Sequence, residues 1–303
     1  MSEIVFTVNS MDGWRQSVAY HAPALGMQPR GALWMGHAMM ANRRSLDRPV
    51  GEGLASTLAA AGFHVYNADI RGHGESGPLA SESGRWSYDD IVLKDIPALS
   101  HWVKERHPDL PLVVVGHSLV GHGTLASLGQ VPGQPVDAVV SVASNAWVRQ
   151  LERSPVRWMR KRAALVPFIG ISRAFGYFPA RRLKVGSEDE ARAYVEQFDQ
   201  WASSDRWGSA DGTRDYLAGL AKVTQPVLAI SGAADTLLCP TRDCRAFHAR
   251  LRNAPVTYWE VSRHSRFGYD ANHMSLVTSK RGARLWQEIA RWTTETLAAR
   301  GAA

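Results

Sequence analysis

Cysteine is scarce in this chain of 303 residues, which contains only Cys239 and Cys244. Two neighbouring thiols do not supply the disulfide framework that stabilises small secreted domains. They also fall short of the three or four ligands that a protein metal site needs. We therefore interpret both as structural thiols in a reducing compartment and expect a cytoplasmic protein with no metal and no cofactor.

Long hydrophobic runs are also missing. The longest ones, at residues 110–115 and 226–230, have the length of β-strands. A membrane-spanning helix needs about 20 consecutive apolar residues, so the sequence predicts no membrane span. Residues 1–10 contain no basic segment that leads into an apolar one, and we therefore expect no signal peptide.

Acidic residues are outnumbered by basic ones, 28 to 35, which gives a formal net charge of +7. Part of the excess lies in residues 149–162, where six arginines and lysines gather. Such a cluster is compatible with phosphate binding, but a charged run of this kind is usually the solvated face of a helix. We therefore predict no nucleic-acid partner.

Extended and helical segments alternate along most of the chain. An Asp-Gly turn is expected to join two strands at residues 3–8 and 14–21. Further strands are expected at residues 31–35, 63–68, 110–115, 136–142, 227–230 and 255–261. Helices are expected at residues 51–61, 88–106, 119–128 and 280–299. Alternation of this kind places helices on both faces of a mostly parallel sheet, so the expected fold class is α/β.

The most informative segment is Leu-Val-Val-Val-Gly-His-Ser-Leu-Val-Gly at residues 112–121. A β-branched apolar run ends at Gly116, Ser118 follows, and a helix-compatible stretch comes next. This pattern predicts a strand, a sharp turn and a helix, with the serine in a strained conformation at the apex. A side chain at position 116 would crowd such a turn, which explains Gly116.

This segment resembles the nucleophile elbow of the α/β-hydrolase superfamily, Gly-x-Ser-x-Gly. The second glycine of that motif, which lets the start of the helix pack closely against a neighbouring strand, is replaced by Val120. The larger side chain either needs matching space on that strand or shifts the turn. Residues 69–76, Asp-Ile-Arg-Gly-His-Gly-Glu-Ser, are similar to a second turn of the family. There we expect Asp69 and Arg71 to pair and brace the turn.

The resemblance implies a catalytic acid and a histidine downstream of the serine, because a serine hydroxyl needs a base that is oriented by an acid. Asp235 follows a predicted strand in a loop with a glycine before it and a proline after it, as the family's acid does. Two histidines compete for the role of base. His273 precedes the last helix, as in the family, and is preferred over His264, which directly follows the last strand.

The family's oxyanion hole is built from backbone N–H groups, which leave little trace in a sequence. One donor is expected at Leu119, directly after the serine. The loop Gly-His-Ala-Met-Met at residues 36–40 resembles the family's His-Gly segment, with Ala38 replacing the glycine. The second donor is therefore expected at Met39, with Met40 as the alternative.

The alternation breaks between residues 147 and 224, a stretch rich in arginine and aromatic residues. The resemblance implies a helical cap inserted at this point. We therefore expect an eight-stranded, mostly parallel sheet flanked by helices, whose core is formed by residues 1–146 and 225–303, with residues 147–224 as the cap.

The leading hypothesis is a serine hydrolase that cleaves a carboxylic ester or thioester of a hydrophobic small molecule through an acyl-enzyme. An acyltransferase or a lyase on the same fold is an alternative, because fold alone does not fix function. A binding module is a third, since Val120 and Ala38 depart from the family's motifs. The expected partner is a small-molecule substrate, and the sequence is compatible with a homo-oligomer.

Overall fold

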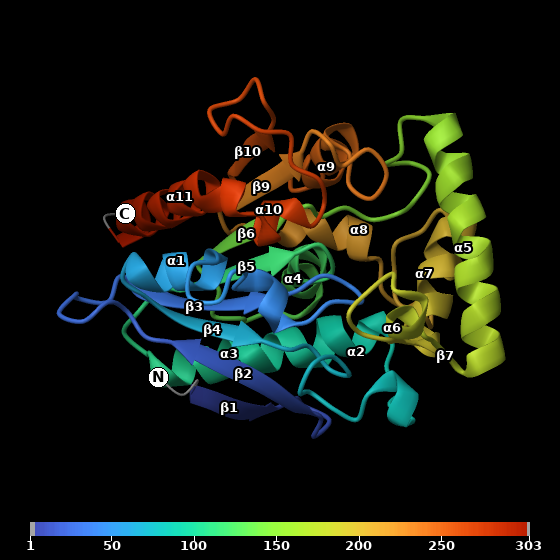
Figure 1. The fold of residues 1–303 in the computed structure, drawn as a ribbon, viewed down its shortest axis with the longest axis horizontal. Coiled ribbons are helices and arrows are strands. Elements are labelled where there is room, and N and C mark those ends of the chain that lie inside the picture. Colours follow the sequence, from blue (N-terminus) through green and yellow to red (C-terminus); the bar gives the residue numbers. More distant parts are fainter. Residues whose placement is uncertain (1–3, 302–303) are drawn as a thin grey trace.

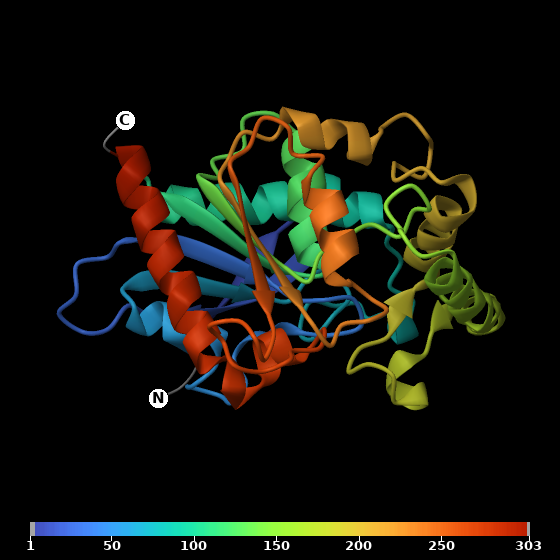
Figure 2. The same ribbon diagram turned by 90° about the horizontal axis from the view of Figure 1, so that it is seen from above.

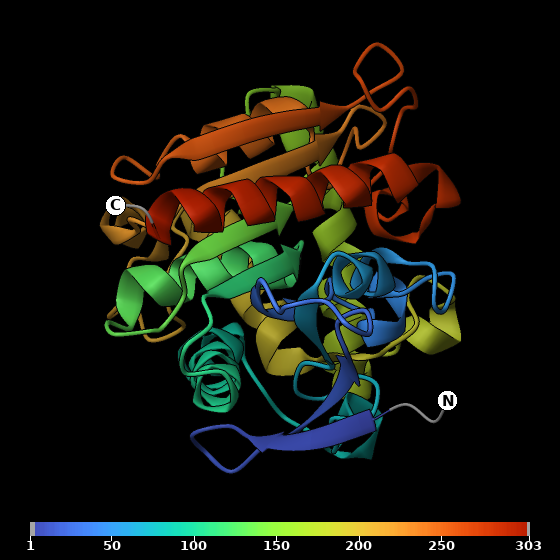
Figure 3. The same cartoon turned by 90° about the vertical axis from the view of Figure 1, so that its left-hand side faces the viewer.

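A single eight-stranded sheet forms the centre of the protein. The computed structural model describes residues 4–301. The strands are β1 (Ile4–Asn9), β2 (Arg15–His21), β3 (Gly31–Gly36), β4 (Phe63–Ala68), β5 (Leu112–His117), β6 (Ala138–Val142), β9 (Val227–Gly232) and β10 (Val256–Val261). Their order across the sheet is β1-β2-β4-β3-β5-β6-β9-β10. Figure 3 shows this order, with the hairpin of β1 and β2 at one edge and β10 at the other.

The sheet is parallel except at the hairpin, since β1 pairs with β2, and β2 with β4, in antiparallel fashion. Every residue of β3, β5, β6 and β9 is buried, which agrees with strands covered by helices on both faces. The predicted strands are therefore found, with ends shifted by at most two residues. Of the strand expected at residues 3–8, Glu3 lies outside the described residues.

Helices cover both faces of the sheet. On one face lie α1 (Leu54–Ala60) and α11 (Ala283–Gly301), which contact each other. On the other face lie α3 (Ile96–Arg106) and α4 (Leu119–Gln130). Later in the sequence, α9 (Thr241–His248) follows β9 and α10 (Ser275–Thr278) follows β10. Figure 3 shows α11 running across one face. Within residues 4–301, no helix combines the length and the apolar character needed to cross a bilayer.

The helix predicted at residues 88–106 is interrupted. It consists of α2 (Tyr88–Asp90), a π-helical turn at Ile91–Asp95 and α3. Pro97 lies at the start of α3, where it has no N–H to donate and its ring would clash with the carbonyl four residues earlier. A wider turn before the proline relieves that clash.

The elements between residues 147 and 224 gather at one end of the molecule, opposite the last turn of α11 (Figures 1 and 2). They are α5 (Pro155–Phe175), β7 (Tyr177–Phe178), α6 (Ala180–Leu183), β8 (Glu190–Ala191), α7 (Arg192–Ser204) and α8 (Tyr216–Gly219). α5 packs against α7, and their contact includes a small apolar cluster with Leu165, Ile169 and Val195. This end faces the carboxyl ends of the parallel strands.

Val120 fits because β3 contains a glycine at the point of contact. A Cβ atom at Gly36 would lie 2.6–2.9 Å from the side-chain carbons of Val120. In the family's motif the missing side chain is on the helix, at the second glycine. Here it is on the strand, at Gly36, and this leaves room for Val120. Val120 is fully buried in this hollow, and α4 keeps its packing against the sheet.

The expected pairing of Asp69 with Arg71 is wrong. Asp69 pairs with Arg43, whereas Arg71 binds Asp95 and Asp12. Arg43 and Asp95 are themselves buried charged groups that need a counter-ion, so each of them binds one residue of the turn. The turn is braced by these two separate clusters.

Substitution of Gly36 tests the contact with Val120. We expect Gly36→Ala to lower the free energy of unfolding by about 1–3 kcal/mol, because the new methyl group overlaps the valine. In a Val120→Ala background the same change should cost clearly less. Urea unfolding of the two single variants and the double variant measures this coupling.

Gly170→Ala is the matched control, because a Cβ atom at that exposed position of α5 meets nothing within 4 Å. It should leave stability unchanged or raise it by up to about 1 kcal/mol. Equal costs of Gly36→Ala in both backgrounds would contradict the proposed packing.

Candidate active site

Ser118 occupies a sharp turn between β5 and α4. Its backbone has φ 52° and ψ −105°, a region that residues other than glycine rarely adopt. The turn closes because two glycines meet across it: a Cβ atom at Gly116 would lie 2.4 Å from the backbone nitrogen of Gly121. Gly121 in turn packs against Ser144, whose Oγ would lie 2.0 Å from an added Cβ. The half-buried Ser118 therefore stands at the N-terminus of α4, where the helix dipole favours negative charge.

Asp235 and His273 are joined by a hydrogen bond of 2.6 Å between Oδ2 and Nδ1. Both residues are buried. The other oxygen of Asp235 accepts the backbone N–H of Leu238 at 3.0 Å. Burial alone would raise the pKa of Asp235, but the hydrogen bond and electrostatic attraction to His273, together with the backbone N–H groups of Cys239 and Leu238, outweigh burial and hold the pKa below its usual value. The carboxylate is therefore ionised and oriented toward the imidazole.

His273 is also fixed through its backbone. Nε2 of His117 lies 3.0 Å from the carbonyl oxygen of His273, so His117 donates its N–H there. Burial and the nearby His273 lower the pKa of His117 to about 3, which keeps it neutral. His264, the competing histidine of the sequence, is exposed and does not line the cavity of Ser118.

Ser118 and His273 line one cavity of about 310 Å³, together with Leu119, Met39 and Met40. Within residues 4–301 no hydrogen bond joins the Ser118 hydroxyl to His273. The remaining walls are mostly apolar and come from the core and from α5 and α7: Ala38, His122, Asn145, Trp147, Ala164, Leu165, Phe168, Val185, Tyr194, Phe198, Leu238 and Met274. The cavity thus brings all the predicted site residues together except Asp235, which stands behind His273.

The loop after β3 is held by a buried histidine. His37 donates from Nδ1 to the carbonyl of Ala38 at 2.8 Å, while its Nε2 accepts the N–H of Ile70 at 3.0 Å. Burial and the neighbouring His73 keep the pKa of His37 well below its usual value, so both bonds persist near neutral pH. Among the hydrogen bonds of the described chain, none uses the N–H of Met39 or Met40.

Two buried polar clusters attach the elements of residues 147–224 to the core. Glu190 of β8 accepts hydrogen bonds from His73 at 3.2 Å and from Trp86 at 3.0 Å. Although burial opposes it, the Glu190 carboxylate raises the pKa of His73, which also donates to a backbone carbonyl. A charged pair therefore anchors β8.

The second cluster centres on Lys161 of α5, which is almost completely buried. Its Nζ lies 2.9 Å from Glu152 and 3.1 Å from Asp243 of α9, and Arg157 bridges the same two carboxylates. Nζ also lies 5.0 Å from the ring centre of Trp147, a wall of the cavity. The position of this wall therefore depends on a buried ion-pair network.

Sequence reasoning missed His122, Asn145 and Tyr194 as parts of the cavity wall. His122 follows Ser118 by one helical turn, a spacing from which its place could have been found. Tyr194 comes from α7 and Asn145 from the loop after β6, and no local pattern marks either.

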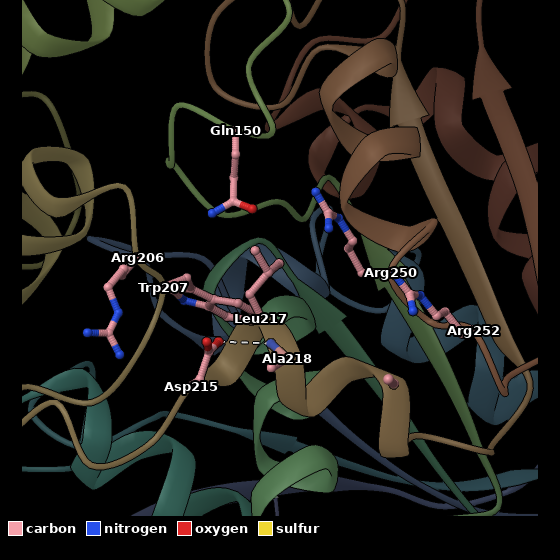
Figure 4. A pocket seen from close by; sticks show the side chains of 9 residues that line it. Gln150, Arg206, Trp207, Asp215, Leu217, Ala218, Arg250 and Arg252 are labelled. Carbon is pink, nitrogen blue, oxygen red and sulfur yellow. Dashed lines mark hydrogen bonds between the residues drawn. The ribbon is translucent and has the colours of Figure 1, made fainter.

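A separate hollow of about 360 Å³ lies between residues 150–221 and the end of α9, and it holds none of the predicted site residues. Figure 4 shows Arg206 and Arg250 on opposite sides of it, while Asp215 accepts the backbone N–H of Ala218. Its lining includes no serine, cysteine or histidine. Cys239 and Cys244 are free and buried, and within residues 4–301 no three potential metal ligands cluster.

Comparison with known proteins agrees with this geometry. A family model described as serine aminopeptidase, S33, matches residues 50–267, well over half of the chain. The chain belongs to this α/β-hydrolase family. The match spans the serine turn and the acid loop and confirms the predicted superfamily.

Individual proteins are similar to this chain over shorter stretches. Human Protein ABHD12B is 34% identical over 103 residues, which are 32% of this chain and 26% of that protein. Monoacylglycerol lipase from Mycolicibacterium smegmatis is 30% identical over 115 residues, 37% of this chain and 38% of that lipase. The aligned parts thus span well under half the length of either relative.

Among solved structures, an esterase from Pyrococcus furiosus superposes with a TM-score of 0.61 at 16% identity, covering 98% of this chain and 91% of the esterase. At that identity the likeness concerns the fold. Together with the family match, these findings confirm the predicted eight-stranded α/β-hydrolase sheet, and the matched family is by its description one of serine hydrolases.

Removal of Lys161 tests the ion-pair network. Lys161→Ala should lower the free energy of unfolding by about 3 kcal/mol or more, because two buried carboxylates then keep only Arg157 as a counter-ion. Arg160→Ala, an exposed neighbour on the same helix, is the control and should change stability by less than about 0.5 kcal/mol. Thermal unfolding followed by circular dichroism compares them, and equal stabilities would contradict the structural role of Lys161.

Proposed function

We propose that this protein hydrolyses carboxylic esters of hydrophobic small molecules through an acyl-enzyme on Ser118. The observation that carries the proposal is the buried hydrogen bond between Asp235 and His273, whose imidazole faces the cavity that Ser118 also faces. A carboxylate, an imidazole and a hydroxyl in this order are what nucleophilic catalysis by serine requires.

In the first step, Oγ of Ser118 attacks the ester carbonyl while Nε2 of His273 accepts the hydroxyl proton. Asp235 holds Nδ1–H and stabilises the imidazolium that forms. The backbone N–H groups of Leu119 and Met39 bind the oxyanion, and the Leu119 group lies at the start of α4, where the helix dipole adds to it. His273 then gives its proton to the departing alcohol.

Water completes the reaction in a second step. His273 takes a proton from a water molecule, the hydroxide attacks the acyl-enzyme carbonyl, and the proton returns to Ser118 as the acid leaves. Both half-reactions use the same base and the same oxyanion donors, as in other serine hydrolases.

The substrate class follows from the walls of the cavity. Leu165, Phe168 and Phe198 contribute apolar surface to the cavity, which favours an acyl or alcohol group of hydrophobic character. Two similar proteins, a monoacylglycerol lipase and lysophosphatidylserine lipase ABHD12, are lipases by name, which fits an ester of lipid type. In this proposal residues 147–224 act as the cap that encloses the substrate.

Labelling with a fluorophosphonate probe tests the nucleophile and the base. We expect the probe to modify Ser118, as located by mass spectrometry, and Ser118→Ala to abolish both labelling and ester hydrolysis. His273→Ala should lower kcat/KM for a 4-nitrophenyl ester by roughly 10⁴-fold or more.

His264→Ala is the matched control for the base, and it should retain wild-type labelling and turnover. Failure of the folded wild-type protein to react with the probe, or normal turnover by His273→Ala, would contradict the proposed function. Esters of graded acyl length then measure the preferred chain.

Asp235→Asn tests the acid separately. The amide fits the same space but cannot stabilise an imidazolium, so kcat should fall by roughly 10²–10⁴-fold while the fold is retained. Asp270→Asn, in the same loop as His273 but paired with the exposed Arg263, serves as the control. Similar rates for the two variants would show that Asp235 does not support catalysis.

A further inference from the structure

His122 is a second histidine in the cavity, one helical turn after the serine. Its backbone N–H donates to the carbonyl of Ser118 at 3.0 Å, and its side chain lines the cavity with only 8% of its surface exposed. Side chains of a helix lean toward its N-terminus, so the imidazole lies over the turn that contains Ser118. The mechanism derived above gives His122 no role.

One ring nitrogen of His122 is occupied. Nδ1 lies 2.8 Å from the hydroxyl of Tyr88, and Tyr88 is fully buried. Burial and the neighbouring Tyr194 raise the pKa of Tyr88 well above its usual value, so this hydroxyl keeps its proton. Within residues 4–301, Nδ1 of His122 is the acceptor found for it. A buried hydroxyl that donates to nothing is destabilising, which favours donation from Tyr88 to His122.

This hydrogen bond assigns the tautomer of His122. Since Nδ1 accepts, the proton of the neutral ring is on Nε2. Burial and the neighbouring His273 lower the pKa of His122 to about 3, so the ring is neutral near pH 7. The Tyr88 and Trp207 rings pack against it at 5.4 Å and 5.9 Å and fix its orientation.

The N–H on Nε2 has no partner within the described chain. Nε2 is not among the fully buried atoms that lack a partner, and His122 lines the cavity. Because Nδ1 is bound to Tyr88, the edge of the ring that carries Nε2 is the one that faces the cavity. Nε2–H of His122 is therefore a hydrogen-bond donor in a cavity with mostly apolar walls, an arrangement that fixes the orientation of a ligand.

We propose that His122 is a positioning residue, whose Nε2–H binds an oxygen atom of the substrate close to the scissile ester. The preferred substrate is then an ester that carries an ether, carbonyl or hydroxyl oxygen within a few bonds of the reacting carbonyl. This inference rests on the proposed function and deepens it. The oxygen belongs either to the acyl part or to the alcohol part, and the experiment distinguishes the two.

Matched ester pairs measure this selectivity. One pair differs on the acyl side, with 4-nitrophenyl methoxyacetate and 4-nitrophenyl butyrate. The other differs on the alcohol side, with the 2-hydroxyethyl and propyl esters of one fatty acid. The ratio of kcat/KM within each pair is compared between the wild type and His122→Phe, so that intrinsic differences in ester reactivity cancel.

We expect the ratio for one pair to fall about 3- to 10-fold in His122→Phe, the size of one lost hydrogen bond, mainly through a higher KM for the oxygen-bearing ester. His122→Gln, which can keep an N–H near the position of Nε2, should restore part of the ratio. Tyr88→Phe removes the group that fixes the tautomer and should give an intermediate ratio.

Fluorophosphonate labelling of Ser118 establishes that each variant has an assembled site. Unchanged ratios for both pairs in a labelled His122→Phe protein would overturn the role of His122 while leaving the proposed function intact. Equal losses in His122→Phe and His122→Gln would overturn it too, because shape and not donation would then govern selectivity. Absence of any ester hydrolysis by the wild type overturns both proposals.

Discussion

The strained turn at Ser118 is the constraint on which the rest of the site depends. A positive φ at a serine is strained, and it persists because the surrounding packing stabilises it. Here that packing consists of close backbone approaches. Gly116 meets Gly121, Gly121 meets Ser144, and Gly36 receives Val120. The departure from the usual elbow motif at Val120 is thus balanced by an absent side chain on the neighbouring strand. The same packing holds α4 in line behind the serine, which aims the helix dipole and the Leu119 N–H at one point.

Burial gives the histidines around this turn different tasks. His37, His117 and His122 have pKa values well below the usual range, because a charged ring would be desolvated. Neutral imidazoles can each donate on one side and accept on the other, and these three hold a loop, the backbone of His273 and the Tyr88 hydroxyl. His273 alone among the histidines of the cavity has a carboxylate, Asp235, on its ring. Of the two histidines that line the cavity, His273 is therefore the one whose ring has a counter-ion.

The sequence was sufficient for the features that local patterns encode. The run of β-branched residues before Gly116 and the position of Asp235 after a buried strand led to the sheet and to three residues that the structure brings together. Pairings across long sequence separations were beyond reach. Asp69 and Arg71 looked like partners only because they are neighbours, whereas their charges are met by Arg43 and Asp95. The walls of the cavity were equally hidden, since Tyr194 approaches it through the packing of α7.

The two parts of the chain contribute different properties to one cavity. The groups proposed for the chemistry all follow strands or begin helices of the core, where the backbone is fixed by the sheet. The apolar walls come largely from α5 and α7, which are attached to the core by Glu190 and by the network around Lys161. Breaking either attachment would leave charges buried without partners, so the walls are held nearly as firmly as the reacting groups. Substrate selectivity can then be altered through residues such as Phe168 and His122 without a change in the backbone that positions the reacting groups.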